Sequence, residues 1–289
     1  MLDSRAEVRR FYDGGSYEGS PDPSADPQIV LERHSEDGIE SFAMRRRLAY
    51  RDREVGQILV PAGPDFRTDL TSVPWLFTWL VPKTGAHLPA ALLHDGLVAD
   101  RDGSGSSYVA DREIPRDEAD RILRDAMADT GTGPIRRWLV WSAVATATIF
   151  VGSADWSRAR WTAYRAAAAI TIGVVLVLGT LATLDLLDVG GVVLPWMGHR
   201  VWWQEVIGGF AGAVAIPFVL GLTWGRFRVA GTVLGVLLAI LLHVSLALLL
   251  LTGLYQGLEW LTRRLPRALM AAAGVVVTVS VLLVVVLVL

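Results

Sequence analysis

Three short polar clusters in the first half of the chain carry side chains suited to acid–base or metal chemistry. They are Thr68-Asp69-Leu70-Thr71-Ser72, His94-Asp95 and Asp117-Glu118-Ala119-Asp120. Together the clusters supply carboxylates, hydroxyl groups and one imidazole. General acid–base catalysis uses these groups, and carboxylates are the ligands that Ca²⁺ and Mg²⁺ prefer.

The spacing of His94 and Asp95 predicts how the clusters meet. Neighbouring side chains on a helix point about 100° apart, so these two cannot face the same partner. If His94 faces Asp120, the carboxylate fixes the imidazole tautomer and supports His94 as a general base. Asp95 then faces the loop of Asp69, and the two carboxylates offer a site for Ca²⁺ or Mg²⁺. This arrangement predicts metal-assisted hydrolysis, with His94 and Asp120 catalytic and Asp95 and Asp69 on the metal.

The same residues have simpler interpretations, and the sequence leaves them open. His94 and Asp120 are also typical of a buried pair that only stabilises a core. Thr68, Ser72 and Asp117 are candidates for supporting roles, but hydroxyl groups are common in turns, and acidic residues are favoured in the first turn of a helix. A nucleophilic triad of Ser72, His94 and Asp120 is a further alternative, although no glycines of a nucleophile elbow surround Ser72.

A small α+β domain is predicted to position these clusters, with a hairpin or small sheet followed by a helical hairpin. Strand patterns cover Phe42–Tyr50 and Val55–Val60, on either side of a charged turn. Helical patterns cover Leu88–Ala99, Arg116–Asp129 and Ile135–Phe150. The segment up to residue 28 is polar and rich in Gly, Ser and Pro, so we expect it to be flexible.

The stretch from about Leu48 to Phe150 resembles a family of phages and bacteria known only as domain of unknown function 1353. The residues that carry the resemblance are Val60-Pro61-Ala62-Gly63, Thr68-Asp69-Leu70-Thr71-Ser72-Val73-Pro74, His94-Asp95, and Arg116-x-x-Ala119-Asp120 with Met127. The resemblance implies no established activity. The chain departs from the family pattern at Pro64-Asp65, which lengthen a turn, and at Val98, where an aromatic residue is common.

A looser resemblance concerns mechanism. A His-Asp pair on one helix and an Asp on an antiparallel helix is similar to the arrangement of the phospholipase A2 superfamily. It implies that His94 activates water, that Asp95 binds Ca²⁺ and that Asp120 orients the imidazole. The chain departs from that superfamily because it has no Cys, no clear Gly-rich Ca²⁺ loop, and Val98 in place of a Tyr. A phospholipid is therefore the candidate substrate.

Four apolar runs after residue 165 predict an all-α transmembrane bundle of four helices. Each run approaches or reaches the about 20 residues that cross about 30 Å of hydrocarbon, and none has a charge in its middle. The runs are Ala166–Leu184, Val206–Leu222, Val229–Leu254 and Ala268–Leu289. The chain is then organised as a flexible segment (1–28), a soluble domain (29–152), an interfacial helix or linker (153–165) and the four-helix region (166–289).

The orientation in the membrane is predicted from basic residues near the span ends. One side carries Arg158, Arg160, Arg165, Arg226 and Arg228, and the other carries Arg200, Arg263, Arg264 and Arg267. Five arginines against four barely decide the orientation, but residues 1–12 lack the apolar stretch of a signal peptide. A domain made without a signal peptide most simply stays in the cytoplasm. We therefore expect a multi-pass protein of the cell (inner) membrane with a cytoplasmic N-terminal domain. Insertion of the short apolar stretch Leu139–Val151 would reverse this topology.

The expected partners are the lipid bilayer and a phospholipid substrate. A net charge of −2 gives no support for nucleic-acid binding, and the absence of Cys excludes a disulfide scaffold. Arg45-Arg46-Arg47, predicted on a strand, is typical of a solvated patch or one that faces anionic headgroups. Glycines four residues apart permit close helix packing, in a bundle or in a homo-oligomer. They are Gly208/Gly212, Gly221/Gly225 and Gly231/Gly235.

Two other classes of function stay open. The first is a non-catalytic structural or interaction domain on a membrane anchor. The second is a small channel or transporter with a regulatory head, since His243 is a titratable residue inside a predicted span. The acidic residues Asp185, Asp188 and Glu205 lie at span ends, where charge is tolerated, so an anchor is favoured over a channel.

Overall fold

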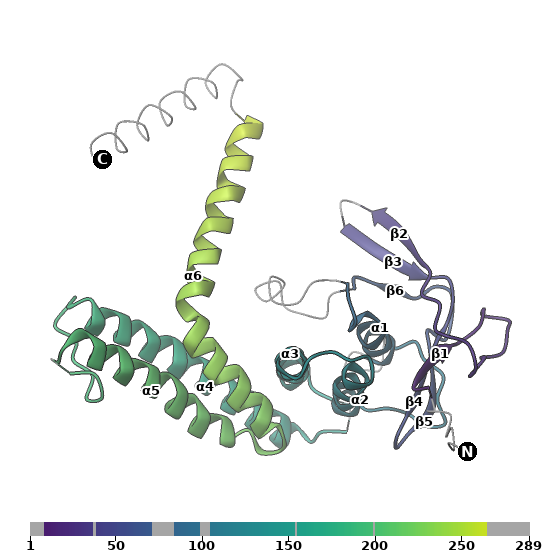
Figure 1. Ribbon diagram of the computed structural model, residues 1–289, viewed down its shortest axis with the longest axis horizontal. Helices are drawn as coiled ribbons and strands as arrows, with labels where there is room; N and C mark the ends of the chain where they lie inside the picture. The colour runs from purple at the N-terminus through teal and green to yellow at the C-terminus, as the bar shows by residue number, and fades with distance from the viewer. Residues whose placement is uncertain are drawn as a thin grey trace, which may run out of the picture. The chain divides into compact units, whose positions relative to one another are not determined.

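The computed structural model describes residues 9–36, 39–70, 84–98, 105–153, 155–198 and 200–264. The chain divides into two compact units, residues 1–240 and residues 241–289. The first unit contains the strands, three helices of which α1 packs on the strands, and the beginning of the long apolar helices (Figure 1). All the sequence clusters discussed above lie in this first unit.

Six short strands form two antiparallel sheets. The first sheet has the order β1-β4-β5, with β1 at Phe11–Asp13, β4 at Leu48–Asp52 and β5 at Gly56–Val60. The second has the order β2-β3-β6, and its strands are Leu31–Glu36, Ile39–Met44 and Arg67–Thr68. Strands β4 and β5 form the predicted hairpin, with Leu48 opposite Val60 and Asp52 opposite Gly56. Strand β1 lies in the segment that we expected to be flexible, and it pairs with β4.

The strand predicted over Phe42–Tyr50 is interrupted, which corrects the sequence analysis. Strand β3 ends at Met44 and β4 begins at Leu48, so the two pieces belong to different sheets. The run Arg45-Arg46-Arg47 lies in the bend between them and not on a strand. Each of these guanidinium groups has a partner: Arg45 contacts Glu32, Arg46 contacts Asp13, and Arg47 donates to the carbonyl of Gly19. Three consecutive charges do not fit the in–out alternation of a half-buried strand.

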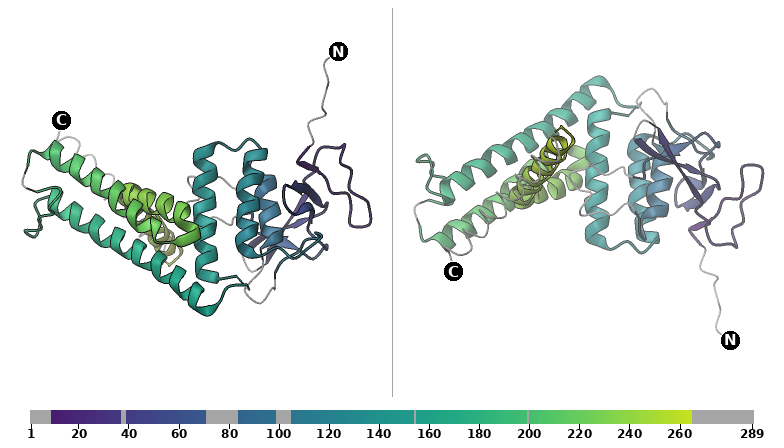
Figure 2. Two further views of the ribbon diagram at one scale, coloured as in Figure 1. Left: turned by 90° about the horizontal axis from the view of Figure 1, so that it is seen from below. Right: turned by 90° about the horizontal axis from the view of Figure 1, so that it is seen from above.

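The three predicted helices are confirmed. Helix α1 covers Leu88–Leu97, α2 covers Arg116–Asp129 and α3 covers Pro134–Val151. Strands β4 and β5 pack on α1, α1 packs on α2, and α2 packs on α3, so the helices lie side by side (Figure 2). The apolar stripe predicted on α2 is fully buried, and its members are Ala119, Ile122, Leu123, Ala126 and Met127. Helical periodicity thus correctly predicted which face of α2 is buried in the core.

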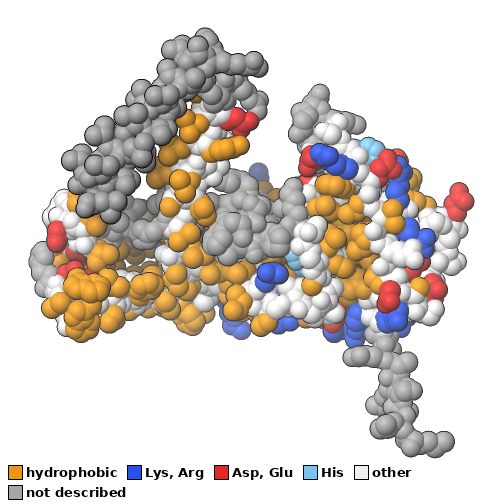
Figure 3. All heavy atoms as spheres, turned by 45° about the horizontal axis from the view of Figure 1, so that its top comes forward, with side chains coloured by type: hydrophobic (Ala, Val, Ile, Leu, Met, Phe, Trp, Pro, Cys, Tyr) orange, Lys and Arg blue, Asp and Glu red, His pale blue; other side chains and the backbone are white. Residues whose placement is uncertain are grey.

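Three helices are long and apolar enough to cross a membrane. They are α4 at Arg158–Leu186, α5 at Trp202–Leu222, and the first part of α6, which runs from Arg228 to Arg264. The fourth predicted span, Ala268–Leu289, lies outside the described residues. Helices α4 and α5 carry exposed apolar side chains, among them Ile170, Val177 and Phe210. Figure 3 shows apolar side chains over the long helices, whereas charged side chains gather over the strands.

Two boundary predictions around the first span change. Helix α4 is continuous from Arg158, so residues 158–165 of the expected interfacial helix or linker (153–165) form its first turns. The ring of Trp161 lies under the guanidinium of Arg165 at 4.9 Å, and its indole N–H donates to the carbonyl of Ile149. The stretch Leu139–Val151 belongs to α3, and most of its apolar residues are buried in the core beside α2, whereas Phe150 and Val151 are exposed.

Several of the spaced glycines are used in contacts within the chain. A Cβ atom at Gly221 would lie 2.3 Å from the backbone nitrogen of Thr232, so α5 and α6 cross with their backbones in contact. A Cβ atom at Gly231 would collide with the ring of Trp224. At the other end of the helices, Asp185 accepts a hydrogen bond from the backbone N–H of Leu194. The homo-oligomer stays a prediction, and the side chain of His243 lies outside the described part of the chain.

The first testable prediction concerns the ion pair that ties the β4–β5 hairpin to α2. Burial alone would raise the pKa of Asp52, but hydrogen bonds from Arg121 and from the backbone N–H groups of Glu54 and Val55 lower it to about 2. A lowered pKa stabilises the fold at pH values above the unfolded pKa, and this stabilisation is lost as the pH falls from about 4 to about 2. Asp52→Asn should therefore cost about 2 kcal/mol at pH 7. Thermal unfolding in detergent should show Asp52→Asn less stable than the wild type at pH 7, and this difference should disappear in acid. The exposed Glu18→Gln is the control and should match the wild type.

The second prediction concerns the crossing of α5 and α6. Leucine at position 221 has no space, because the backbone of the facing helix occupies the position of its Cβ atom. Gly221→Leu should lower the melting temperature in detergent by several degrees or abolish folding. Gly173→Leu is the matched control, since no atom lies within 4 Å of the Cβ position there. Equal melting temperatures for the two variants would contradict this packing.

Candidate functional site

A His–Asp pair joins α1 to α2 in the core of the domain. The Nε2 atom of His94 lies 2.9 Å from Oδ1 of Asp120, and the two side chains are 4% and 1% exposed. The sequence analysis predicted this contact from the positions of the two residues on adjacent helices. Because Asp120 is acceptor-only when ionised, the contact places the proton of a neutral imidazole on Nε2.

The other polar atoms of this pair have no hydrogen-bond partner among the described residues. These atoms are Nδ1 of His94 and Oδ2 of Asp120, and both are buried. With the proton on Nε2, the Nδ1 atom carries a lone pair and is the basic atom of the ring. A buried polar atom without a partner costs free energy, and such atoms are rare in folded proteins. The arrangement therefore leaves a hydrogen-bond acceptor available in the interior of the domain.

The neighbour of His94 faces the second cluster, as the helical spacing predicted. The hydroxyl of Thr68, at the end of β6, donates to Oδ2 of Asp95 at 2.5 Å. The same hydroxyl oxygen accepts the backbone N–H of Leu70 at 2.9 Å. Leu70 has a φ of 61°, in the left-handed region that non-glycine residues rarely adopt. Strained backbone of this kind is often found at functional sites.

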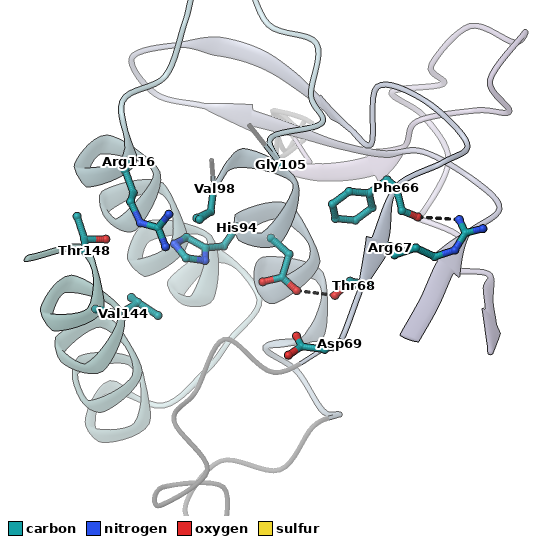
Figure 4. Close-up of a pocket in the computed structure, with 12 residues that line it drawn as sticks. Phe66, Arg67, Thr68, Asp69, His94, Val98, Gly105, Arg116, Val144 and Thr148 are labelled. Atoms are coloured by element: carbon teal, nitrogen blue, oxygen red, sulfur yellow. Dashed lines mark hydrogen bonds between the residues drawn. The ribbon is translucent and has the colours of Figure 1, made fainter. Parts of the chain in front are cut away.

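A cavity of about 480 Å³ brings the two clusters together (Figure 4). Its polar lining comes from β6 and its following loop (Arg67, Thr68, Asp69), from α1 (His94, Asp95) and from the start of α2 (Arg116). Its apolar lining includes Phe66, Val98 and the α3 residues Val144 and Ala147. In Figure 4 the side chain of Arg116 extends toward His94. The cavity thus combines a buried imidazole, two carboxylates and the guanidinium of Arg116. The guanidinium of Arg67 points away from the cavity and donates to the carbonyls of Pro64 and Phe66 (Figure 4).

Two predicted supporting residues are placed differently from the main cluster. Thr68 lines the cavity and holds Asp95, which fits a supporting role. Asp117 does not line it, because its carboxylate forms an ion pair with Arg226, in the turn between α5 and α6. Burial raises the pKa of Asp117, although the charge of Arg226 acts in the opposite direction. Ser72 lies outside the described residues, so the triad alternative stays a prediction.

The predicted metal site stays a prediction. Asp69 and Asp95 line the same cavity. Among the described residues, no group of three or more His, Cys, Asp or Glu side chains is placed to hold a metal ion. Mg²⁺ usually keeps several water ligands and needs only one or two carboxylates together with substrate oxygens. A pair of carboxylates is therefore compatible with a cation that binds together with its substrate.

The sequence analysis missed the role of Gly96, two residues after His94. A Cβ atom at this position would lie 2.7 Å from a methyl group of Val60 on β5, and the carbonyl of Gly96 accepts the N–H of Ser107 at 2.7 Å. The glycine therefore lets α1 lie directly against the sheet, which sets the depth of His94. A glycine inside a predicted helix is the signal that points to such a close approach.

The comparison with family models agrees with this site. Residues 42–144 match the family described as protein of unknown function (DUF1353). Residues 42–144, about a third of the chain, are therefore similar to that family, and this part is called the DUF1353 domain below. No curated protein and no solved structure matches the chain. The matched segment includes β6, α1 and α2, and therefore the residues that form the polar lining of the cavity, whereas α4, α5 and α6 lie beyond it.

The third prediction concerns the proton of the buried imidazole. The contact with Asp120 requires the neutral His94 of the DUF1353 domain to carry its proton on Nε2, with Nδ1 bare. Nitrogen NMR of protein labelled at His should show this tautomer, with the His94 signals assigned by their loss in His94→Ala. Asp120→Asn should change the His94 signals and leave those of His34 in place. A proton on Nδ1 in the neutral form would contradict the arrangement.

Proposed function

We propose that the DUF1353 domain is a hydrolase that acts at a membrane, with a phospholipid ester as the candidate substrate. The observation that carries the proposal is the orientation of His94. One ring nitrogen is held by Asp120 at 2.9 Å, and the other has no partner among the described residues. A histidine held in this way is suited to act as a general base, because its tautomer is fixed and its basic atom is available.

The proposed reaction uses groups that line the cavity. Nδ1 of His94 takes a proton from a water molecule, and the hydroxide oxygen attacks the carbonyl carbon of the ester. The bond between that carbon and the alcohol oxygen then breaks, and the leaving alcohol takes the proton from His94. Asp120 stabilises the protonated imidazole in between, as an orienting carboxylate does. The guanidinium of Arg116 lies where it can attract an anionic substrate.

A divalent cation is part of the proposal. Asp95 and Asp69 are the residues that would hold Ca²⁺ or Mg²⁺, and the ion would polarise the ester carbonyl. What supports this is the position of both carboxylates on the lining of the cavity that also contains His94. Thr68 holds the Asp95 carboxylate through its hydroxyl, which limits the orientations that Asp95 adopts.

The location at a membrane is supported by the apolar helices. Helices α4, α5 and the first part of α6 each have the length and composition of a span. The turn between α5 and α6 contacts α2 through Arg226 and Asp117, so this turn lies on the same side as the DUF1353 domain. The five arginines of that side of the predicted topology favour the cytoplasmic face of the cell membrane. A lipid substrate would then be adjacent to the domain.

A structural role is the second candidate. The observation that favours it is the burial of the His94 and Asp120 side chains, which are only 4% and 1% exposed. A histidine paired with a carboxylate in a core stabilises the packing of two helices without any reaction. In that case the pair would matter for stability, and removing one partner would cost about 3–5 kcal/mol.

The fourth prediction is the assay that separates these candidates. The purified full-length protein should release fatty acid from mixed phospholipid vesicles in the presence of Ca²⁺ or Mg²⁺, and chelation should stop the release. His94→Ala should lower the rate about 100-fold or more, since general bases contribute factors of this order. Asp95→Asn should abolish the dependence on the cation. The exposed Asp65→Asn, close to the same loop, is the matched control and should retain full activity.

Three outcomes are decisive. Release of fatty acid that is lost in His94→Ala, with an unchanged melting temperature, supports the hydrolase. No release from vesicles under any metal condition removes the phospholipid hydrolase. A His94→Ala protein that melts several degrees lower, in the absence of any release by the wild type, supports the structural role instead.

A further inference from the structure

The short turn between the two apolar helices α5 and α6 packs into the same buried cluster as the helices of the DUF1353 domain. The turn is a 3₁₀ helix at Gly225–Phe227. The ring of Phe227 packs on Trp156 and Tyr164 with ring centroids 5.6 and 5.3 Å apart. Phe227 and the preceding Trp224 are 4% and 0% exposed, and they belong to the same cluster of buried side chains as the residues of α1 and α2. The turn is thus a fixed part of the domain.

One charged contact crosses from this turn to the helix that carries Asp120. The guanidinium of Arg226 pairs with Oδ2 of Asp117, in the first turn of α2. The side chain of Asp117 is only 5% exposed, and its Oδ1 atom has no hydrogen-bond partner among the described residues. A buried carboxylate of this kind is costly to ionise without a cation.

The charges around Asp117 act in opposite directions. Burial raises the pKa of Asp117, Arg226 lowers it, and the carboxylates of Asp155 and Asp120 raise it further. The structure pairs Arg226 with Asp117. Removal of the Arg226 guanidinium would therefore leave the Asp117 carboxylate beside those of Asp155 and Asp120 without this cation. Asp117 would then be neutral below its raised pKa and would repel the neighbouring carboxylates above it.

Asp117 and Asp120 lie one turn apart on the buried face of α2, where side chains three residues apart are neighbours. The charge of Asp117 therefore acts directly on the carboxylate that holds His94. Arg116 immediately precedes Asp117 in the chain, and its side chain lines the cavity. The first turn of α2 thus carries one residue that pairs with the turn of the apolar helices, Asp117, and one that lines the cavity, Arg116.

We propose that Arg226 is a positioning residue for the His94–Asp120 pair: by neutralising Asp117, it keeps Asp120 in place on His94. The site of the DUF1353 domain is then complete only with the apolar helices attached. The inference deepens the proposed function and rests on it for the catalytic role of His94. The effect of Arg226 on the pair, through Asp117, is tested without any assay of activity.

The fifth prediction uses the NMR signals of His94 in the full-length protein as the readout, recorded from pH 6 to pH 9. In Arg226→Gln, these signals should lie closest to those of the wild type at the lowest pH, where the smallest fraction of Asp117 is ionised. They should diverge as the pH rises, because the ionised Asp117 then repels Asp120. Arg226→Lys keeps the charge and should match the wild type throughout. Arg228→Gln removes an exposed arginine two residues away and is the matched control.

A double variant separates charge from folding. Adding Asp117→Asn to Arg226→Gln removes the carboxylate that needs a cation, so the His94 signals should return to those of the wild type at every pH. The proposal is overturned if Arg226→Gln leaves the His94 signals unchanged up to pH 9. It is also overturned if the double variant fails to restore them. If Arg226→Gln does not fold, the double variant and Arg226→Lys must fold with wild-type His94 signals, and their failure to do so overturns the proposal.

The hydrolysis assay distinguishes this inference from the proposed function. If vesicle hydrolysis is detected, Arg226→Gln should lower the turnover number more at high pH than at low pH, and Arg228→Gln should not. If no hydrolysis is detected but the His94 signals respond as described, the proposed function fails and the role of Arg226 stands.

Discussion

The contact between His94 and Asp120 is the constraint on which the arrangement of the domain depends. A histidine and a carboxylate that are almost fully buried must meet at hydrogen-bond distance, because either group alone would carry a large desolvation cost. The contact therefore fixes how α1 and α2 lie against each other. Once α1 is fixed with His94 toward α2, the neighbouring Asp95 must point toward β6. There the hydroxyl of Thr68, at the end of β6, donates a hydrogen bond to the Asp95 carboxylate.

The strands and glycines provide the remaining geometry. Gly96 lets α1 approach β5 without a side chain between them, which sets the depth of the imidazole in the core. On the opposite side, Asp52 joins the β4–β5 hairpin to Arg121 on α2. The helix that carries Asp120 is thus held by the sheet as well as by α1. A site held in this way keeps its geometry through supporting contacts rather than through the reacting groups alone.

The apolar helices and the domain share one core. Trp224, just before the turn between α5 and α6, and Phe227, at the end of that turn, are as buried as residues of α1 and α2. The indole N–H of Trp224 donates to Thr171 of α4, and Gly221 lets the backbones of α5 and α6 touch. The crossing of these helices therefore positions the turn that carries Arg226. Changes in the packing of the helices would reach α2 through this turn, because Arg226 in the turn pairs with Asp117 in the first turn of α2.

The sequence by itself determined the features that depend on local spacing. Helical periodicity gave the bounds of α2 and its buried stripe, the apolar runs gave three of the long helices, and adjacent positions gave the opposite directions of His94 and Asp95. Only the tertiary structure decided that the strand over Phe42–Tyr50 divides between two sheets and that Arg226 pairs with Asp117. The reason is physical. Periodicity is set by neighbours along the chain, whereas a pair more than a hundred residues apart depends on how every element between them packs.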